Sequence, residues 1–297
     1  MEEKLNPVEQ EFLEMLQRND PMTDIDVGTQ GEVKKIKLKN GVFYAVKAYS
    51  NNNEQKKKLT YEHESKVTRH IAEQCQDYLV CFSGSVVYNH HGVNQYWLIT
   101  KFLEGYEELY KLLYEKPPSP ISFWLKDKRE NPKIKIYIDM IKGLSLLHEK
   151  LNVSHHDIKP DNIMVNYETS QIKYIDFGLA CMESSVCVPV GSYEYMPPEI
   201  VQIRSLEAAK NGDLWSLGCV IVVSEYGILP IDNAAEFVLD QTKRPERLVR
   251  INEFVRRLNS SPENFIIQRD GYKIDLTKLL NMDPSKRTLE CYEKTRE

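Results

Sequence analysis

The chain has 297 residues, 41% of them hydrophobic, and a formal net charge of -5 at pH 7. This length and hydrophobic content are enough for a sizeable core, in one large domain or in two lobes. The acidic balance argues against a nucleic-acid or anionic-membrane partner that is held by bulk charge.

The six cysteines are scattered, which favours a reduced compartment. None forms a Cys-x-x-Cys pair, and no His/Cys spacing suggests a zinc site. We therefore expect an intracellular, cytoplasmic protein. No N-terminal apolar run resembles a signal peptide, and the longest apolar segment, residues 217–223, is too short to cross a bilayer. We expect no membrane insertion.

The first third of the chain is expected to be mostly strands with one main helix. Apolar residues around Phe12 predict a short amphipathic helix within an N-terminal extension, residues 1–24. Apolar alternation then leads into Asn40-Gly41, a strong signal for a two-residue hairpin. A charged helical segment follows at residues 54–74. Two further strand candidates lie at residues 79–88 and 96–100.

The rest of the chain is expected to be mostly helical. Five apolar residues recur at helical spacing, namely Ile134, Ile138, Ile141, Leu144 and Leu147. Residues 213–226 are apolar nearly all round, as in a helix that is buried on every side. Residues 229–278 are also interpreted as helical. These patterns predict an α+β fold, with a small antiparallel sheet before a large helical part.

The stretch from Ser154 to Val165 places an acid, a cation and an amide on one short loop, namely Asp157, Lys159 and Asn162. Phosphoryl transfer needs an acceptor for the hydroxyl proton, a positive charge for the migrating phosphoryl group and a metal ligand. The run Ser-His-His-Asp-Ile-Lys-Pro-Asp-Asn-Ile-Met-Val resembles the catalytic loop of eukaryotic-type protein kinases, with one substitution. His156 stands where that family usually has arginine.

This resemblance implies the bilobal protein-kinase fold. A small N-lobe with an antiparallel sheet and one main helix would span residues 25–103, hinge included, and a large, mostly helical C-lobe residues 104–297. It also implies ATP and Mg²⁺ as cofactors, and a protein substrate with a serine or threonine acceptor. Asp157 would accept the hydroxyl proton, and Lys159 would neutralise the γ-phosphoryl group in transit.

Glycines before the first hairpin resemble the loop that covers nucleotide phosphates in this family. Gly28, Gly31 and Val33 match it, and Asp26 replaces the first glycine. Glycine lets backbone amides approach phosphate oxygens closely. Two glycines three residues apart are by themselves most often an ordinary turn, so the motif depends on the strand that follows.

That following strand supplies a lysine. Ala45 and Lys47 match the Val-Ala-Ile-Lys strand, whose lysine contacts the α- and β-phosphates. The family pairs this lysine with a glutamate on the helix of the small lobe, where Glu62 and Glu64 are both candidates. Glu64 shares its helical face with apolar residues three and seven positions on, so we expect it to be the partner.

The hinge is expected at residues 101–103. Thr100 would be the gatekeeper, and the backbone around Phe102 and Leu103 would bind adenine. Glu107 opens the next helix. It would contact the ribose or a basic residue of a substrate, or else simply stabilise the helix N-terminus.

Asp176-Phe177-Gly178 resembles the metal-binding motif of the same family. It follows an apolar run, at the place where the hairpin after the catalytic loop should end. The resemblance implies that Asp176 and Asn162 bind Mg²⁺ beside the phosphates. Asp213 is expected to begin the central helix and to hydrogen-bond the backbone of the catalytic loop.

Features nearer the C-terminus favour a serine/threonine protein kinase. The segment that ends at Glu199 resembles the end of the activation segment, and Glu199 is expected to pair with Arg287 in a buried ion pair. Lys159 and Ser192 favour serine or threonine acceptors, because tyrosine kinases usually differ at both positions.

Two alternatives remain open. Small-molecule phosphotransferases with a kinase-like loop lack the peptide-docking segment around Glu199. A pseudokinase, acting as an ATP-binding scaffold, is supported only by Asp26 and His156. We also expect no dependence on phosphorylation at Ser184 or Ser185, because a neutral imidazole cannot grip a phosphate as arginine does.

Overall fold

The structure, a computed structural model, describes residues 4–28, 31–72, 75, 77–114, 133–183, 187–227 and 244–295. The chain divides into two compact units. The first consists of Met1–Gly105 together with Asp176–Gly178, and the second of Tyr106–Ile175 together with Leu179–Glu297.

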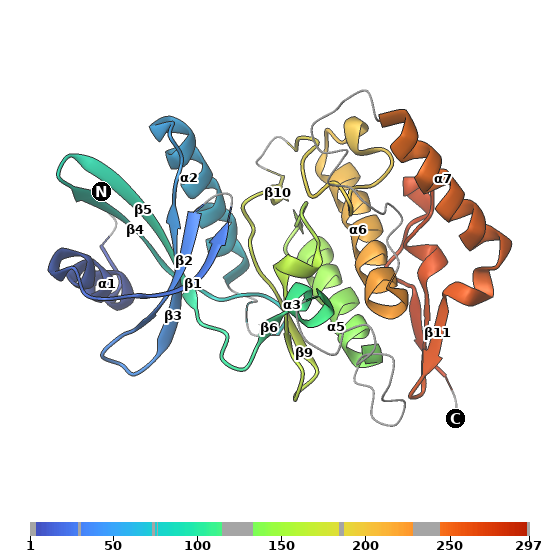
Figure 1. Cartoon of the computed structure of the whole chain (residues 1–297), viewed down its shortest axis with the longest axis horizontal. Helices are drawn as coiled ribbons and strands as arrows, with labels where there is room; N and C mark the ends of the chain where they lie inside the picture. Colours follow the sequence, from blue (N-terminus) through green and yellow to red (C-terminus); the bar gives the residue numbers. More distant parts are fainter. Residues whose placement is uncertain are drawn as a thin grey trace. The chain divides into compact units, whose positions relative to one another are not determined.

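A five-stranded antiparallel sheet forms the centre of the first unit, in the order β1-β2-β3-β5-β4 (Figure 1). The elements are α1 (Pro7–Arg18), β1 (Thr23–Gly28), β2 (Gly31–Lys37), β3 (Phe43–Tyr49), α2 (Glu54–Ile71), β4 (Phe82–His90) and β5 (Val93–Lys101). The expected small antiparallel sheet with one main helix is confirmed.

The expected hairpin around Asn40-Gly41 joins β2 to β3, but its loop has three residues, Lys39 to Gly41, because Leu38 still hydrogen-bonds Val42. Gly41 has a φ of 78°, a conformation that glycine adopts without strain. A two-residue turn joins β4 to β5 through His91 and Gly92, both at positive φ. These two tight turns set the register of the central strands.

Helices cover the two faces of this sheet (Figure 1). On α1, Phe12 packs against Trp97 and a cluster that includes Tyr44 and Val46. On α2, Tyr61 packs among side chains of the alternate strand positions, Tyr49, Tyr96 and Leu98. Because successive strand residues point to opposite faces, α1 and α2 lie on opposite sides of the sheet.

Helix α1 begins at a full capping box. The Asn6 side chain accepts hydrogen bonds from the Val8 and Glu9 amides, and the Glu9 carboxylate accepts one from the Asn6 amide. Glu9 also accepts from the Ser85 amide on β4 at 2.9 Å. The helix is therefore joined to the sheet by polar as well as apolar contacts.

The second unit is mostly helical. Its helices within the described residues are α3 (Leu109–Tyr114), α5 (Lys133–Ser145, continued by the π-helical turn Leu146–Lys150), α6 (Leu206–Tyr226) and α7 (Arg244–Ser260). Its strands are β6 (Glu107–Glu108), β7 (Val153–Ser154), β8 (Ile163–Asn166), β9 (Gln171–Tyr174), β10 (Cys181–Met182), β11 (Ile266–Arg269), β12 (Tyr272–Asp275) and β13 (Tyr292–Lys294). Short 3-10 turns lie at Pro160–Asn162, Ile200–Gln202, Pro262–Phe265, Leu276–Lys278 and Pro284–Lys286.

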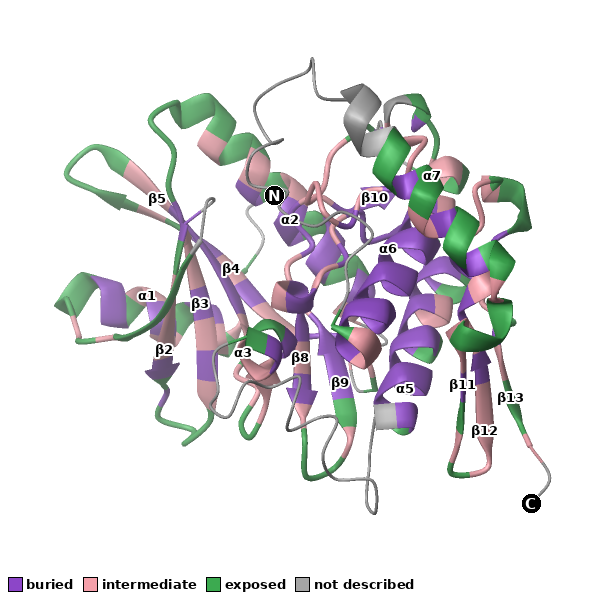
Figure 2. Ribbon diagram, turned by 45° about the vertical axis from the view of Figure 1, so that its right-hand side comes forward, coloured by how far each residue is buried: buried purple, intermediate pink, exposed green. Residues whose placement is uncertain are grey.

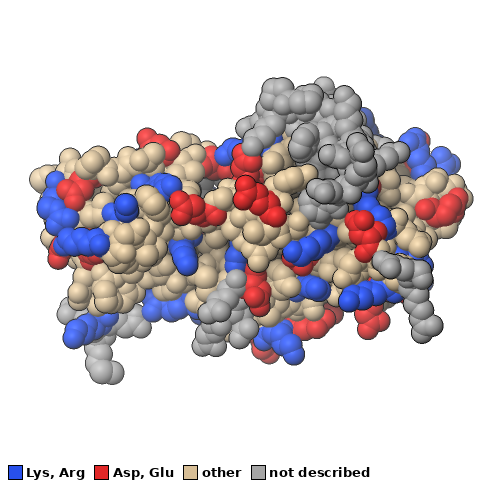
Figure 3. Space-filling model, turned by 90° about the horizontal axis from the view of Figure 1, so that it is seen from below, with Lys and Arg blue, Asp and Glu red and all other residues tan. Residues whose placement is uncertain are grey.

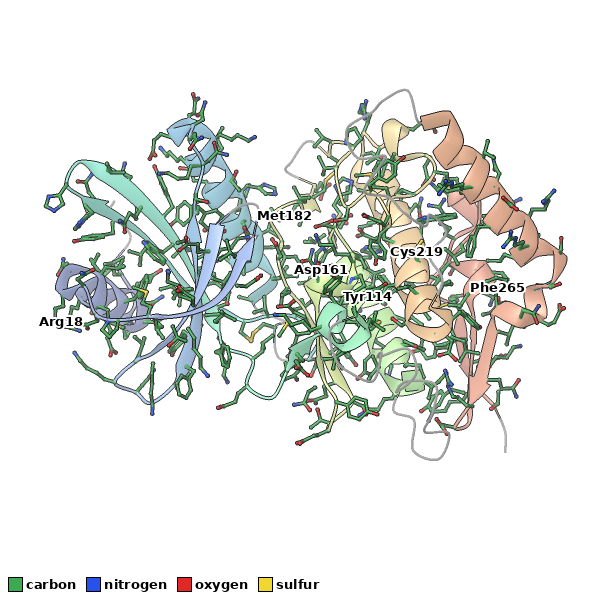
Figure 4. The ribbon with its side chains drawn as sticks, viewed as in Figure 1. Arg18, Tyr114, Asp161, Met182, Cys219 and Phe265 are labelled. Atoms are coloured by element: carbon green, nitrogen blue, oxygen red, sulfur yellow. A yellow bond between two sulfur atoms is a disulfide. The ribbon has the colours of Figure 1, made fainter. Side chains whose placement is uncertain are left out.

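Helix α6 is the core of the second unit, as its apolar sequence predicts. It is buried along most of its length (Figure 2), and its own residue Cys219 is fully buried (Figure 4). Gly227 ends the helix in the left-handed conformation. Among the described helices, none is long and apolar enough to cross a membrane. On the face drawn in Figure 3, basic and acidic side chains are interspersed.

One expectation from the sequence is wrong. Within residues 229–278, β11 and β12 form a hairpin where we expected helix, and its turn is Asp270-Gly271. Asp-Gly is a strong hairpin signal, so the sequence could have predicted this turn. The structure also contains the disulfides Cys75–Cys81 and Cys181–Cys187, which the cysteine spacing did not predict.

Candidate active site

In the first unit, Lys47 on β3 is held by two carboxylates. Its ammonium contacts the oxygens of Glu64 at 2.8 and 3.0 Å and Oδ1 of Asp176 at 3.2 Å. Glu64 comes from α2 and is only 2% exposed, whereas Glu62 pairs with Lys58 at the surface. Of the two glutamates considered on α2, Glu64 is therefore the one that contacts Lys47.

The ammonium and the two carboxylates of this cluster shift each other's pKa values. Burial raises the pKa of Glu64, and the charge of Lys47 opposes that rise. Burial alone would lower the pKa of Lys47, but the charges of Glu64 and Asp176 raise it overall. Two carboxylates around one ammonium leave a negative charge, and carboxylate oxygens are ligands that Mg²⁺ prefers. The cluster thus fits a divalent cation at Asp176.

Asp176 is held in a strained backbone conformation. Its φ is 58°, and its Oδ1 accepts a hydrogen bond from the Gly178 amide at 3.2 Å. The neighbouring Phe177 is buried and anchors the tripeptide. A positive φ at a residue other than glycine is costly, and such strain often occurs at functional sites.

In the second unit, Asp157 is surrounded by donors. Its Oδ1 accepts from the Ser192 hydroxyl at 2.8 Å and its Oδ2 from the Asn162 amide at 3.0 Å. The Lys159 ammonium lies 3.4 Å from the same Oδ2. The structure therefore brings together the acid, the cation and the amide that the loop sequence singles out, and adds Ser192 to them.

Asn162 is oriented by the same loop. Its amide nitrogen donates to both the backbone oxygen and the carboxylate of Asp157. The amide nitrogen is thereby engaged, so the carbonyl oxygen of the side chain is the atom that suits a cation. Its chemistry fits the role that the sequence suggests.

Asp213 on α6 fixes the backbone before Asp157. Its carboxylate accepts from the His155 and His156 amides at 2.7 and 2.8 Å, and from the side chains of Ser154 and His148. Burial alone would raise the pKa of Asp213, but the His148 hydrogen bond and the nearby histidines lower it overall. The expected contact between Asp213 and the catalytic loop is present.

His156 is a buried and neutral link in this loop. Its φ is 67°, and burial lowers the pKa of its imidazole. Its Nε2 has no hydrogen-bond partner among the described residues. Gly191 packs against its carbonyl so closely that a Cβ there would come within 2.8 Å of the oxygen. The cavity beside them, of about 10 Å³, is no larger than one water molecule requires.

The glycine loop is described only in part, because Thr29 and Gln30 lie outside the described residues. Gly28 ends β1 and pairs with Gly31. A Cβ at Gly31 would lie 1.9 Å from the Ala48 oxygen, so the pairing of β2 with β3 itself requires glycine there. Val33 lies opposite Lys47 on the paired strand.

The remaining nucleotide candidates lie on neighbouring strands. Ala45 on β3 pairs with Thr100 on β5. The Phe102 amide donates to the Phe43 oxygen at 3.1 Å, so that amide is engaged within the first unit. Leu103 follows it and is partly buried.

Glu107 does not begin a helix, because it lies in β6, two residues before α3, and pairs with Val165 on β8.

The expected pair of Glu199 and Arg287 is present and two-pronged. Arg287 donates through both terminal nitrogens to the Glu199 oxygens, at 2.6 and 2.9 Å. The Arg287 side chain is 0% exposed and also donates to the backbone oxygens of Asn281 and Asn211. The segment that ends at Glu199 is thus fixed to the core of the second unit.

Sequence reasoning missed two contacts of this site. The Tyr49 hydroxyl donates to Glu64 at 2.6 Å, which the alternation of β3 could have suggested, because Tyr49 shares a face with Lys47. His148 reaches Asp213 from the π-helical turn after α5, and no local pattern signals that contact.

Comparison with known proteins places these residues in a family. Residues 21–291 match the model of the protein kinase domain. The chain is 28% identical to the MAP kinase kinase MKK1/SSP32 of Saccharomyces cerevisiae over 88% of its length and 49% of the relative's. It is 29% identical to the mitogen-activated protein kinase kinase 1c of Physcomitrium patens, over 68% of this chain and 55% of the relative.

The chain thus spans about half the length of these relatives. The family match, in contrast, covers most of the chain and includes every residue of the Lys47 and Asp157 clusters. This protein belongs to the protein kinase domain family.

Proposed function

We propose that the protein transfers the γ-phosphoryl group of ATP to serine or threonine hydroxyls of protein substrates. The observation that carries this proposal is the environment of Asp157. Donors from Ser192, Asn162 and Lys159 surround its carboxylate and hold it in one orientation. A carboxylate that is fixed in this way can receive a hydroxyl proton at a defined place.

The reaction forms one bond and breaks another. The acceptor oxygen bonds to the γ-phosphorus, and the bond from that phosphorus to the oxygen bridging it to the β-phosphate breaks, which releases ADP. Asp157 accepts the proton that the hydroxyl loses. Lys159, beside Asp157, neutralises charge on the group in transfer.

A second set of residues would hold the nucleotide. Lys47, kept charged by Glu64 and Asp176, would bind the α- and β-phosphates. Asp176 and Asn162 would bind Mg²⁺ through their side-chain oxygens, and the ion would neutralise phosphate charge. Gly28, Gly31, Val33 and Ala45 would line the nucleotide, with Thr100, Phe102 and Leu103 beside the adenine.

The choice of acceptor is supported by the second unit. The relatives are named as kinases of mitogen-activated protein kinases, and only the class of acceptor, a protein, is carried over from them. The Glu199–Arg287 pair supports a protein acceptor over a small molecule, because it fixes the segment that would dock a peptide. Ser192 on Asp157 supports serine or threonine.

The test is phosphate transfer from Mg²⁺·ATP to generic protein acceptors, with Asp157→Asn as the variant. We expect turnover to fall by about 10²–10⁴-fold, the usual contribution of a positioned base, while the equilibrium affinity for ATP stays within about twofold. Asp270→Asn is the matched control, since Asp270 is exposed in a turn whose left-handed conformation asparagine tolerates.

The outcome separates the alternatives. Turnover that survives in Asp157→Asn would remove Asp157 from the mechanism. A parent protein that binds ATP but transfers nothing would favour the ATP-binding scaffold instead, for which Asp26 and His156 are the sequence signals.

A further inference from the structure

Tyr49 lies outside the motifs that resemble the family, yet it touches the nucleotide cluster. It follows Lys47 by two residues on β3, so the two side chains point to the same face of the sheet. The Tyr49 hydroxyl donates to Oε2 of Glu64 at 2.6 Å, and the Lys47 ammonium contacts the same oxygen at 2.8 Å. One carboxylate oxygen thus accepts from two neighbours on one strand.

The direction of the Tyr49 hydrogen bond is fixed. An ionised carboxylate only accepts, so the phenol donates. Burial, and then the charge of Glu64, raise the pKa of Tyr49 well above its ordinary value, so the hydroxyl keeps its proton. Glu64 is buried as well, and a buried carboxylate with too few donors is costly.

The ring of Tyr49 is fixed independently of its hydroxyl. It meets the Tyr61 ring edge-on, with centroids 5.6 Å apart, and Tyr61 in turn contacts Tyr96 on β5 at 5.2 Å. Tyr61 precedes Glu64 by three residues on α2, so the two share one helical face. Tyr49 therefore contacts one face of α2 in two separable ways. Its ring packs on Tyr61, and its hydroxyl donates to Glu64.

We propose that Tyr49 is a positioning residue of the nucleotide site, and that its hydroxyl fixes the Glu64 carboxylate in the orientation that places the Lys47 ammonium. This inference rests on the proposed function, in which Lys47 binds the phosphates. The last torsion of a glutamate side chain is broad, so hydrogen bonds must set the plane of its carboxylate. Tyr49 supplies a rigid donor for that purpose, because its ring is already held.

The test is a double-mutant cycle of Tyr49→Phe and Glu64→Ala. Equilibrium affinity for Mg²⁺·ATP, KM and kcat, and urea unfolding without nucleotide are measured for each variant. Tyr49→Phe keeps the ring, and we expect it to weaken ATP binding by about tenfold, as for a lost hydrogen bond to a charged group. KM should rise more than kcat falls. In the Glu64→Ala background the same change should have no further effect on affinity, because Tyr49 acts through Glu64.

Tyr61→Phe is the control, since it removes a hydroxyl from the same aromatic cluster but not the one that Glu64 accepts. We expect its ATP affinity to stay within about twofold of the parent. The inference is overturned if Tyr49→Phe binds ATP as the parent does, or if its effect is undiminished without Glu64. Coupling in unfolding alone, without coupling in affinity, also overturns it, because Tyr49 would then only pack. If the unmodified protein binds no ATP, the proposed function itself is rejected. Lys47→Met would then have no effect on ATP affinity.

Discussion

At the scale of single residues, Asp26 is the departure that bears on nucleotide affinity. It lies on β1 opposite Val33, after a shift of register, and is exposed. A carboxylate at the first position of a phosphate-covering loop repels phosphate oxygens, although water weakens the repulsion. We expect Asp26→Gly to lower the KM for ATP by about threefold to fivefold, with little change in kcat.

Asp26→Asn separates charge from backbone freedom, because it removes only the charge. The same gain in Asp26→Asn would assign the effect to electrostatics. An unchanged or higher KM in both variants would show that the carboxylate does not face the nucleotide.

His156 leads to a second prediction at the residue scale, that activity does not depend on phosphorylation of the activation segment. Burial keeps its imidazole neutral near pH 7, so it cannot act as the charged fork with which arginine binds a phosphate. We expect phosphatase pretreatment to leave the rate of substrate phosphorylation within about twofold, and Ser184→Ala, Ser185→Ala to do the same. Both serines lie outside the described residues. A loss of tenfold or more under either treatment would mean that another cation reads a phosphate there.

At the scale of elements, α1 is a structural part of the first unit. Phe12 is fully buried between α1 and the sheet and meets Trp97 edge-on. We expect Phe12→Ala to lower the free energy of unfolding by about 3–5 kcal/mol, the usual cost of removing a buried aromatic ring. Urea unfolding followed by the fluorescence of the tryptophans measures it.

Gln17→Ala is the control for α1, because Gln17 is on the same helix but exposed. It should change the free energy of unfolding by less than about 0.5 kcal/mol. Equal and small effects of both substitutions would show that α1 contributes little to the sheet it covers.

How far the elements follow from the sequence depends on how local their cause is. The hairpin at Asn40-Gly41 and the buried helix α6 were predictable, because turn chemistry and an apolar run act within a few residues. The β11–β12 hairpin was predictable as well, since Asp270-Gly271 signals it. This hairpin was missed because the whole of residues 229–278 was interpreted as helical.

The contacts of the candidate site divide in the same way. Glu64 was preferred over Glu62 from helical spacing alone, and it is the one that contacts Lys47. The His148–Asp213 contact joins residues that are 65 positions apart, and their approach depends on the tertiary fold. No local pattern could have predicted it, because the free energy that brings the two residues together comes from packing elsewhere.

At the scale of the whole molecule, a buried ion pair joins segments that are far apart in the sequence. Arg287 and Glu199 are 88 residues apart, and both belong to the second unit. We expect Arg287→Met to destabilise this unit by about 3–5 kcal/mol, because it leaves the Glu199 charge without its partner. The double variant with Glu199→Gln should be less destabilised than Arg287→Met alone.

Urea unfolding of the two variants and the parent checks this prediction. If the double variant is destabilised by the sum of the single effects, the two side chains do not act as a pair. The loss would then come from the other hydrogen bonds of Arg287, to the Asn281 and Asn211 oxygens.

The position of α1 has a practical consequence for anyone who expresses this protein. The match to the family begins at residue 21, after the helix has ended at Arg18. A truncation at that boundary would remove α1, which packs on Tyr44, Val46 and Trp97. The apolar face of the sheet would then be exposed to solvent. Such surfaces cause aggregation. The shortest well-behaved fragment should therefore start before Asn6, which caps the helix, so that the evolutionary boundary and the folding boundary differ.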